Sequence, residues 1–280
     1  MARVGVVGHV EWVQFAVVAR VPPPGEIVHA RESFSEPAGG GAVAAVQLRK
    51  LAGAATFLTA LGSDGAGRRA AERLREHYGI TLHPAAREAP QRRTFTFLDD
   101  GGERTITVLG ERIVPVRADP LPWDALGDLD AIYFTGGDTA AARAARAARV
   151  LVATPRALEA LVGSGVALDV LVGSADDPGE VYGPGMLDPE PRIVVRTRGA
   201  AGGEWTATGG DDRARSGSWR ATPLPGEPVD AYGCGDSFAA GLTYGLGAGM
   251  ALENAIELGA RCGAACLCGR GPYAAQLELG

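Results

Sequence analysis

The sequence predicts an α/β fold: a doubly wound, mostly parallel sheet with helices on both faces, plus a small β-sheet lid. From residue 130 onward, short apolar runs alternate with helical stretches, which is typical of a parallel sheet covered on both sides. Two extended segments, at about 11–35 and 90–112, do not follow this alternation, and we expect them to form the lid. A length of 280 residues suits one such domain, residues 1–280.

Each element follows from a local pattern of apolar residues, glycines and polar breaks. Residues 3–10 predict a buried strand rather than an export signal, because Glu11 interrupts the apolar run and no small-residue cleavage site follows. The next elements are expected as a helix over 38–52 that opens with glycines, a strand over 55–62, a helix over 68–79 and a hairpin over 93–109 that turns at 99–102. The C-terminal half is expected to contain strands at 130–134, 150–154, 169–173 and 192–197, helices at 139–148 and 155–163, and two terminal helices.

The composition excludes several classes of function. A net charge of −6 gives no basic surface for nucleic acid or for an anionic membrane. No apolar stretch approaches the roughly 20 residues that a membrane-spanning helix needs, so a cytoplasmic location is expected. The cysteines are interpreted as buried thiols, because zinc sites prefer C-x2-C pairs. They are Cys234, Cys262, Cys266 and Cys268.

Two common nucleotide-binding motifs are missing. Lys50 is the only lysine and Leu51 follows it, whereas a P-loop needs Gly-Lys-Ser/Thr. The first apolar run, VGVVGHV, lacks the G-x-G-x-x-G turn of dinucleotide-binding folds. Any nucleotide site in this chain therefore has another design.

The stretch DAYGCGDSFAAGLTYGLGAG, residues 230–249, combines a glycine-rich turn, a carboxylate and a helix. The backbone amides of Gly233, Cys234 and Gly235 precede the helix and can converge on an anion. Asp236 follows them, which leaves two interpretations open. It either caps the helix or accepts a proton from a hydroxyl that attacks a phosphoryl group.

This stretch resembles the D-T-x-G-A-G-D motif of the ribokinase-like (PfkB) carbohydrate kinase family, with small departures at Ala231 and Cys234. The resemblance extends over nearly the whole chain. GGGAVAAVQLRKLAGAATFLTALGSDGAG (39–67) is similar to the family's glycine pair, helix, strand and G-x-D-x-x-G turn. VVRTRGAAGG (194–203) resembles its T-x-G-x-x-G segment, and GRGPY (269–273) resembles its closing turn near the nucleotide.

The resemblance implies an ATP-dependent kinase with Mg²⁺. Asp236 would be the catalytic base, and the amides of residues 233–235 would form the anion hole. The residues that would lie along the nucleotide are Thr197, Gly199, Gly202 and Gly271. The family's N-x-x-E motif falls at Ser174 and Asp177, where an acid suits Mg²⁺, although Asp177 as a solvated loop acid stays open. A monovalent cation, K⁺, would lie near Asp230.

The acceptor side departs from the family pattern. Val13 stands where many members carry an aspartate, and Val43 or Ala44 stands where an asparagine is common. Glu11 shares a strand face with Val13, so it either replaces the missing carboxylate or is a lid charge that faces water. The glycine run Gly39, Gly40 and Gly41 would border the acceptor. The histidines are scattered, and His9, beside this pocket, is expected to be a surface or core residue.

Three functional readings follow. The first is a kinase for a hydroxyl of a sugar or sugar-like molecule. The second is a nucleoside kinase, in which an apolar face of Val13, Phe15 and Val43 packs against a base. The third is a catalytically weak homologue that senses a ligand. Because the edges of lid sheets often pair between subunits, a homodimer through the lid is also a candidate assembly.

Overall fold

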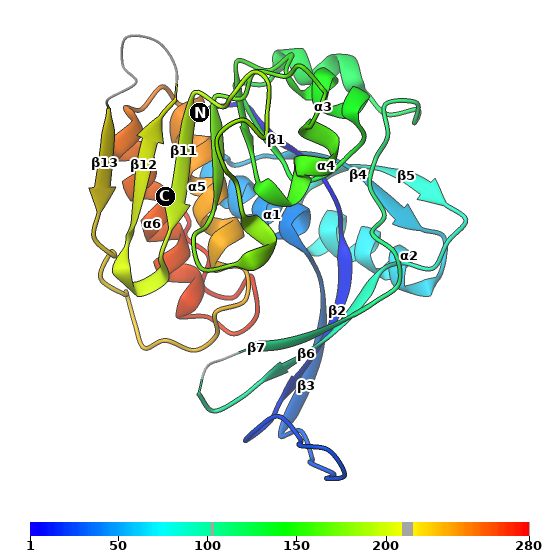
Figure 1. The fold of residues 1–280 in the computed structure, drawn as a ribbon. Helices are drawn as coiled ribbons and strands as arrows, with labels where there is room; N and C mark the ends of the chain where they lie inside the picture. Colours follow the sequence, from blue (N-terminus) through cyan, green and yellow to red (C-terminus); the bar gives the residue numbers. More distant parts are fainter. Residues whose placement is uncertain (102–103, 209–214, 280) are drawn as a thin grey trace.

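The computed structural model describes residues 1–101, 104–208 and 215–279. Its main sheet has nine strands in the order β13-β12-β11-β10-β9-β8-β1-β4-β5 (Figure 1). From β5 to β11 neighbouring strands run parallel, and β12 and β13 continue the sheet antiparallel. The bounds are β1 Val4–Val7, β4 Thr56–Gly62, β5 Thr81–Arg87, β8 Ala131–Phe134, β9 Val150–Ala153, β10 Val170–Ser174, β11 Ile193–Thr197, β12 Gly203–Ala207 and β13 Ser216–Trp219. The predicted parallel α/β sheet is confirmed, whereas β5, β12 and β13 were not predicted.

Helices cover both faces of this sheet, as predicted (Figure 1). Successive strand residues point to opposite sides, so Val6 packs into one apolar cluster and Val7 into another. The first cluster holds residues of α1, α5 and α6, and the second holds residues of α3 and α4. The bounds are α1 Gly40–Ala52, α2 Gly65–Glu72, α3 Thr139–Ala145, α4 Leu158–Leu161, α5 Cys234–Gly247 and α6 Leu252–Leu267. Among the described residues, no helix is both long and apolar enough to cross a membrane.

The expected lid is a separate sheet with the order β3-β2-β6-β7. Its strands are β2 Glu11–Val17, β3 Glu32–Ala38, β6 Arg93–Leu98 and β7 Arg104–Leu109. Figure 1 shows these strands projecting away from the main body below β4 and α2. β6 and β7 pair antiparallel, which confirms the predicted hairpin. Gly102 of its expected turn lies outside the described residues.

Several bounds differ from the prediction. The strand expected over 3–10 ends at Val7, because the chain leaves the main sheet at Gly8 and enters the lid at Glu11. A Cβ at Gly8 would lie 1.8 Å from Oγ1 of Thr135, so the chain crosses here in close contact with the neighbouring strand's end. The helix expected over 155–163 is a short 3-10 turn, Pro155–Ala157, followed by α4.

The cysteines lie mainly on the last helix and match the expectation of buried thiols in part. Cys262 and Cys266 are buried, whereas Cys234 and Cys268 are half-buried. Burial raises the pKa of the Cys262 thiol to about 12, so this thiol stays protonated at neutral pH. It packs as a small apolar side chain.

Candidate active site

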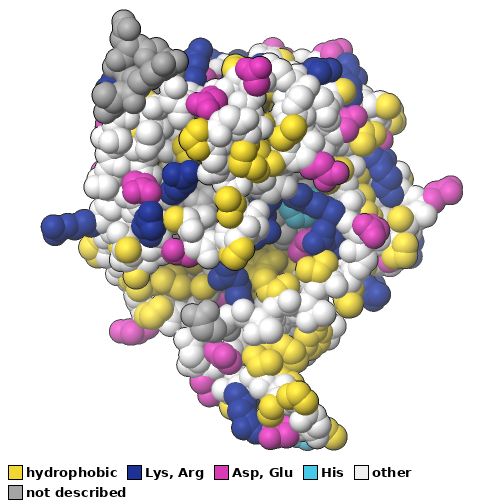
Figure 2. All heavy atoms as spheres, in the orientation of Figure 1, with side chains coloured by type: hydrophobic (Ala, Val, Ile, Leu, Met, Phe, Trp, Pro, Cys, Tyr) yellow, Lys and Arg dark blue, Asp and Glu magenta, His cyan; other side chains and the backbone are white. Residues whose placement is uncertain are grey.

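Two of the predicted site residues, Gly40 and Asp236, meet where α1 and α5 begin. A Cβ placed on Gly40 at the start of α1 would lie 2.9 Å from Oδ1 of Asp236 in the first turn of α5. Figure 2 shows a hollow on this face, in which a histidine side chain lies among basic and acidic ones. Two helix N-termini therefore point their unpaired amides toward one region, which favours negative charge there.

The turn before α5 explains how Asp236 is presented. Gly233 is the N-cap residue, with a φ of 84° that suits glycine, and α5 has no side-chain cap. The interpretation of Asp236 as a capping residue is therefore wrong. Gly235, in contrast, does not have a positive φ, and a Cβ on it would meet nothing within 4 Å. The backbone geometry that favours glycine is therefore found at Gly233, whereas at Gly235 the space above the backbone is open.

Asp236 has the electrostatics of a proton acceptor. Its side chain retains some contact with solvent but is otherwise surrounded by protein. Burial, reinforced by the nearby charge of Glu180, raises the pKa of Asp236 to about 7, while Arg156 and Arg104 oppose the shift. A base with a pKa near the working pH is well matched to accept a proton in a transition state.

Asp230 and Gly271, which are far apart in the sequence, are joined directly. The Asp230 carboxylate is buried and accepts hydrogen bonds from the amides of Tyr232 (2.8 Å) and Gly271 (2.9 Å). Burial raises its pKa despite these bonds. The pair therefore holds the loop before α5 against the turn that follows α6.

Most of the residues expected along the nucleotide, but not Gly271, lie at or just after the carboxyl ends of β10 and β11. Ser174 and Thr197 are register partners on these parallel strands. Gly199 follows in a short 3-10 turn, and a Cβ on it would meet no atom within 4 Å. Gly202 is different, because a Cβ there would lie 2.0 Å from the carbonyl oxygen of Trp219. The carboxyl ends of strands are the usual ligand-binding edge of a parallel sheet.

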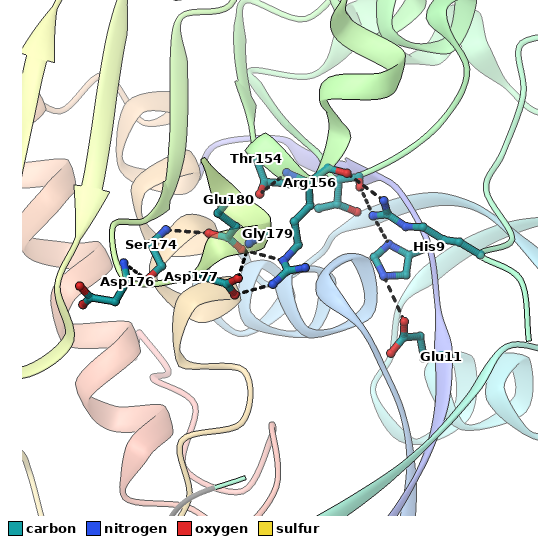
Figure 3. A network of polar contacts seen from close by, with 11 residues as sticks. His9, Glu11, Thr154, Arg156, Ser174, Asp176, Asp177, Gly179 and Glu180 are labelled. Atoms are coloured by element: carbon teal, nitrogen blue, oxygen red, sulfur yellow. Dashed lines mark hydrogen bonds and ion pairs between the residues drawn. The ribbon is translucent and has the colours of Figure 1, made fainter. Parts of the chain in front are cut away.

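Beside them, Arg156 holds two carboxylates, as Figure 3 shows. Its Nη2 lies 2.5 Å from Asp177 Oδ2 and its Nε lies 2.9 Å from Glu180 Oε1. Asp177 Oδ1 also accepts from the amide of Gly179 (2.8 Å), whereas Glu180 Oε2 accepts from the amide of Ser174 (2.6 Å). Glu180 is the more buried of the two acids, and the sequence reasoning missed it. Its only signal was a second acid three residues after Asp177.

On the opposite side of the cleft, Glu11 is buried among basic groups. Its Oε1 lies 3.0 Å from Nε of Arg92 and 3.7 Å from Nε2 of His9. Glu11 is only 9 % exposed, so the interpretation of it as a lid charge facing water is wrong. Burial raises the pKa of Glu11, while Arg92 and Arg112 oppose this shift.

His9 belongs to the same cluster, and it is a buried histidine, as one of the two expected alternatives had it. Its Nδ1 lies 2.9 Å from Nη2 of Arg112. Because a guanidinium only donates, Nδ1 accepts and the ring proton lies on Nε2, the side of Glu11 (Figure 3). Burial, together with Arg112 and Arg92, lowers the pKa of His9 well below its usual 6.5, so the ring is neutral at pH 7.

The glycine run at residues 39–41 lets α1 start directly against this cluster. Gly39 has a φ of 81°, and a Cβ on it would lie 3.1 Å from Cγ of Glu11 and 3.2 Å from the His9 ring. A Cβ on Gly41 would lie 2.6 Å from the carbonyl oxygen of His9. A larger residue at Gly39 would be strained by the positive φ, and one at Gly41 would need the His9 backbone to move.

The apolar residues that might have faced a nucleobase are part of the core. Val13, Phe15 and Val43 are fully buried. Phe15 stacks on Phe34 with ring centroids 4.6 Å apart and meets Tyr232 edge-on at 5.0 Å. These side chains are therefore occupied by protein contacts and present no free apolar face.

The candidate carboxylate ligands for a metal ion do not form a cluster among the described residues. Among the described residues, no group of three or more His, Cys, Asp or Glu side chains forms a metal cluster. Asp177 and Glu180 are the acids next to the nucleotide side. Such a pair fits Mg²⁺, which commonly binds one or two carboxylates and takes its other ligands from phosphates and water.

Comparison with known proteins gives a family match over nearly the whole chain. The sequence model of the pfkB family of carbohydrate kinases matches residues 1–161 and 168–278. Among curated proteins, fructoselysine 6-kinase from Escherichia coli (strain K12) is 48 % identical over 46 residues, which is 16 % of this chain. The match covers only 18 % of that relative's length, which is too little to assign the relative's activity to this chain.

Solved structures share the fold over almost the whole chain. A provisionally assigned ribokinase from Agrobacterium tumefaciens has a TM-score of 0.83 at 21 % identity, covering 98 % of this chain and 94 % of its own. For ribokinase from Thermotoga maritima the TM-score is 0.74 at 19 % identity, covering 99 % and 97 %. For ribokinase from Arabidopsis thaliana the TM-score is 0.72 at 19 % identity, and the match covers 98 % of this chain and 96 % of that protein. At these identities the likeness shows the ribokinase-like fold.

Proposed function

The chain belongs to the pfkB family of carbohydrate kinases, and from this premise we propose that it transfers the γ-phosphate of ATP to a hydroxyl of a sugar or sugar-like acceptor. The observation that carries the proposal is the Asp236 carboxylate, which lies between the starts of two helices with its pKa raised to about 7. A protein that only senses a ligand has no use for a base beside an anion site. This favours catalysis over the ligand-sensing alternative.

In the proposed reaction, Asp236 removes the proton from the acceptor hydroxyl while the hydroxyl oxygen forms a bond to the γ-phosphorus of ATP. The bond from that phosphorus to the bridging oxygen breaks, and ADP leaves with the electron pair. The amides of Gly233, Cys234 and Gly235 are proposed to stabilise the charge on the transferring group. The open space above Gly235 supports this role, because a phosphoryl group needs direct access to the backbone.

ATP is proposed to lie along Ser174, Thr197 and Gly199, with Gly202 and Gly271 shaping the turns beneath it. The adjacency of the first two residues at the carboxyl ends of neighbouring strands supports this. The Arabidopsis ribokinase structure is a complex with ribose and ATP. Mg²⁺, where bound, neutralises phosphate charge, and Asp177 and Glu180 are the acids proposed to hold it through direct or water-mediated contacts.

A monovalent cation near Asp230 is a further part of the proposal. The related fold of phosphofructokinase-2 from Escherichia coli was solved in complex with potassium. Asp230 is buried and negatively charged, which supports a cation nearby, but each of its oxygens already accepts a backbone amide. Its first role is therefore to hold the turn at Gly271, and K⁺ would act next to that turn.

On the acceptor side, Glu11 is proposed to accept a hydrogen bond from an acceptor hydroxyl, and the glycines at 39–41 to leave room for the ring. A sugar is favoured over a nucleoside because Val13, Phe15 and Val43 are buried in the core.

A homodimer through the lid is also proposed. It would form on the edge strand β7, which exposes Ile106 and Val108.

A coupled ADP-formation assay tests the proposed function. ATP and Mg²⁺ are supplied with a library of sugars, sugar acids, sugar phosphates and nucleosides, in K⁺ and in Na⁺ buffers. We expect at least one sugar-like acceptor to support turnover, and Asp236→Asn to lower that rate by about 10²–10⁴-fold. Undiminished turnover in Asp236→Asn, or turnover with nucleosides alone, would contradict the assignment.

A further inference from the structure

Two arginines on the acceptor side of the cleft, Arg92 and Arg112, donate no side-chain hydrogen bond to a carboxylate among the described residues. Arg73, Arg87 and Arg156 each form an ion pair with an acid at 2.6 Å or less. Arg112 instead donates to the carbonyl oxygens of Thr135 (2.6 Å) and Arg156 (2.9 Å), and to Nδ1 of His9. All of these acceptors are neutral.

Arg92 is also incompletely paired. Its Nε lies 3.0 Å from Glu11 Oε1, yet the geometry does not make a hydrogen bond and this buried nitrogen has no other acceptor among the described residues. Glu11 is the acid in ion-pair contact with Arg92, and its charge also acts on Arg112. A buried donor without an acceptor is unfavourable, and a bound group with spare oxygen lone pairs removes that penalty.

The charges around Arg112 do not balance. Burial lowers its pKa, and the repulsion from Arg92 outweighs the attraction from Glu11. The repulsion from Arg156 likewise outweighs the attraction from Glu159. His9 adds no compensating charge because its ring is neutral. Two enclosed guanidinium groups with a positive surplus are a favourable place for an anion.

We propose that the phosphoryl acceptor carries an acidic group, a carboxylate or a phosphate, and that Arg92 and Arg112 bind it. This inference rests on the proposed function and names the substrate class of the same site. Three hydrogen bonds hold the Arg112 guanidinium in place, two of them to backbone carbonyls, so it is oriented before a ligand arrives. A planar guanidinium presents paired donors that match the oxygens of a carboxylate or phosphate. A neutral sugar leaves this charge uncompensated.

Matched acceptors separate the acidic group from the rest of the sugar. D-gluconate is compared with D-sorbitol, and D-ribose 5-phosphate with D-ribose, by ADP formation and by calorimetric binding to the whole protein. We expect the acidic member of at least one pair to have a kcat/KM at least about tenfold higher and a lower Kd. A preference confined to one pair identifies carboxylate or phosphate as the recognised group. Equal or better performance of the neutral member in both pairs overturns the inference.

Variants then test the two arginines. Arg92→Gln and Arg112→Gln should each reduce binding of the preferred acid about 10–100-fold, as expected for loss of a hydrogen bond to a charged group. Arg92→Lys, which keeps the charge, should recover part of that loss. Arg20→Gln is the control, because Arg20 pairs with Glu26 in an exposed part of the lid. Arg92→Gln is the decisive variant if Arg112→Gln does not fold, because the Nε of Arg92 has no hydrogen bond to lose.

The two proposals fail in different ways. If neutral sugars are phosphorylated and acids are not, the kinase assignment stands and the acidic acceptor is excluded. If no compound supports ADP formation, the kinase assignment fails, and calorimetry still decides whether the cleft prefers acids. An acid-to-neutral affinity ratio that is unchanged in Arg92→Gln removes that arginine from the recognition of the acid.

Discussion

Oδ1 of Asp236 and the backbone of Gly40 approach so closely that a Cβ on Gly40 would lie 2.9 Å from the carboxylate oxygen. The first turns of α1 and α5 therefore meet at one carboxylate. Helix N-termini stabilise negative charge, but burial is the larger effect here, since the pKa of Asp236 is raised to about 7. The carboxylate is thus held close to the point where it changes protonation state at neutral pH.

The rate of phosphoryl transfer should depend on pH through Asp236. Because the base must be ionised, kcat/KM should rise with pH and level off above about pH 7, the pKa to which Asp236 is raised. Glu180 contributes to that raised pKa, so Glu180→Gln should move the midpoint to lower pH. A pH-rate profile of both proteins measures this. A midpoint that stays in place would show that another group controls the profile.

The contribution of Asp236 to folding stability should fall as pH rises, whereas its contribution to the rate should increase. The pKa of Asp236 is raised from 3.8 to about 7, so the folded state disfavours the ionised form. This penalty is absent below about pH 4, grows as pH rises through 7, and is complete above it. Asp236→Asn should therefore raise Tm more at pH 8 than at pH 5. Thermal unfolding at both pH values checks this, and an equal change at the two would contradict the assigned pKa.

The glycines around the base form a matched pair of substitutions. Gly40→Ala places a Cβ 2.9 Å from Asp236 Oδ1, so it should displace the carboxylate and lower kcat strongly. In Gly235→Ala the new Cβ meets no protein atom within 4 Å, so Tm should hardly change. If the transferring phosphate uses that space, activity should nevertheless fall. Thermal unfolding and ADP formation on both variants separate the two effects, and normal kinetics in Gly235→Ala would leave residue 235 as a turn residue only.

The parts of the candidate site that the sequence could propose are those with a local pattern of residue type. These parts are the glycine turn with Asp236, Ser174 and Thr197, each at the end of a strand, and the lid segments. Arg92 and Arg112 carry none, because each lies in a loop and reaches the cleft only through tertiary packing, and Glu180, in a short 3-10 turn, has only its spacing from Asp177 as a signal. The antiparallel strands β12 and β13 were missed for a related reason. Their sequences, GEWTA and SGSW, are only five and four residues long and each holds a single large apolar residue, which is too little for a strand pattern to stand out.

Glu11 provides the most direct test of the acceptor side. It is 9 % exposed, and its carboxylate lies between Arg92 and His9, facing the start of α1. If it accepts a hydrogen bond from an acceptor hydroxyl, Glu11→Gln should weaken acceptor binding by about 1.5–3 kcal/mol, the value of a hydrogen bond to a charged group, while the KM for ATP stays unchanged.

The matched control is Glu26→Gln, which removes a carboxylate from an exposed ion pair with Arg20 and should leave both KM values as they are. Glu11→Gln also removes the acid that pairs with Arg92, so that guanidinium gains freedom to bind an anion. The loss should therefore be smaller for an acidic acceptor than for its neutral counterpart. An acceptor KM unchanged in Glu11→Gln would mean that this carboxylate serves only to hold Arg92 and His9 in place.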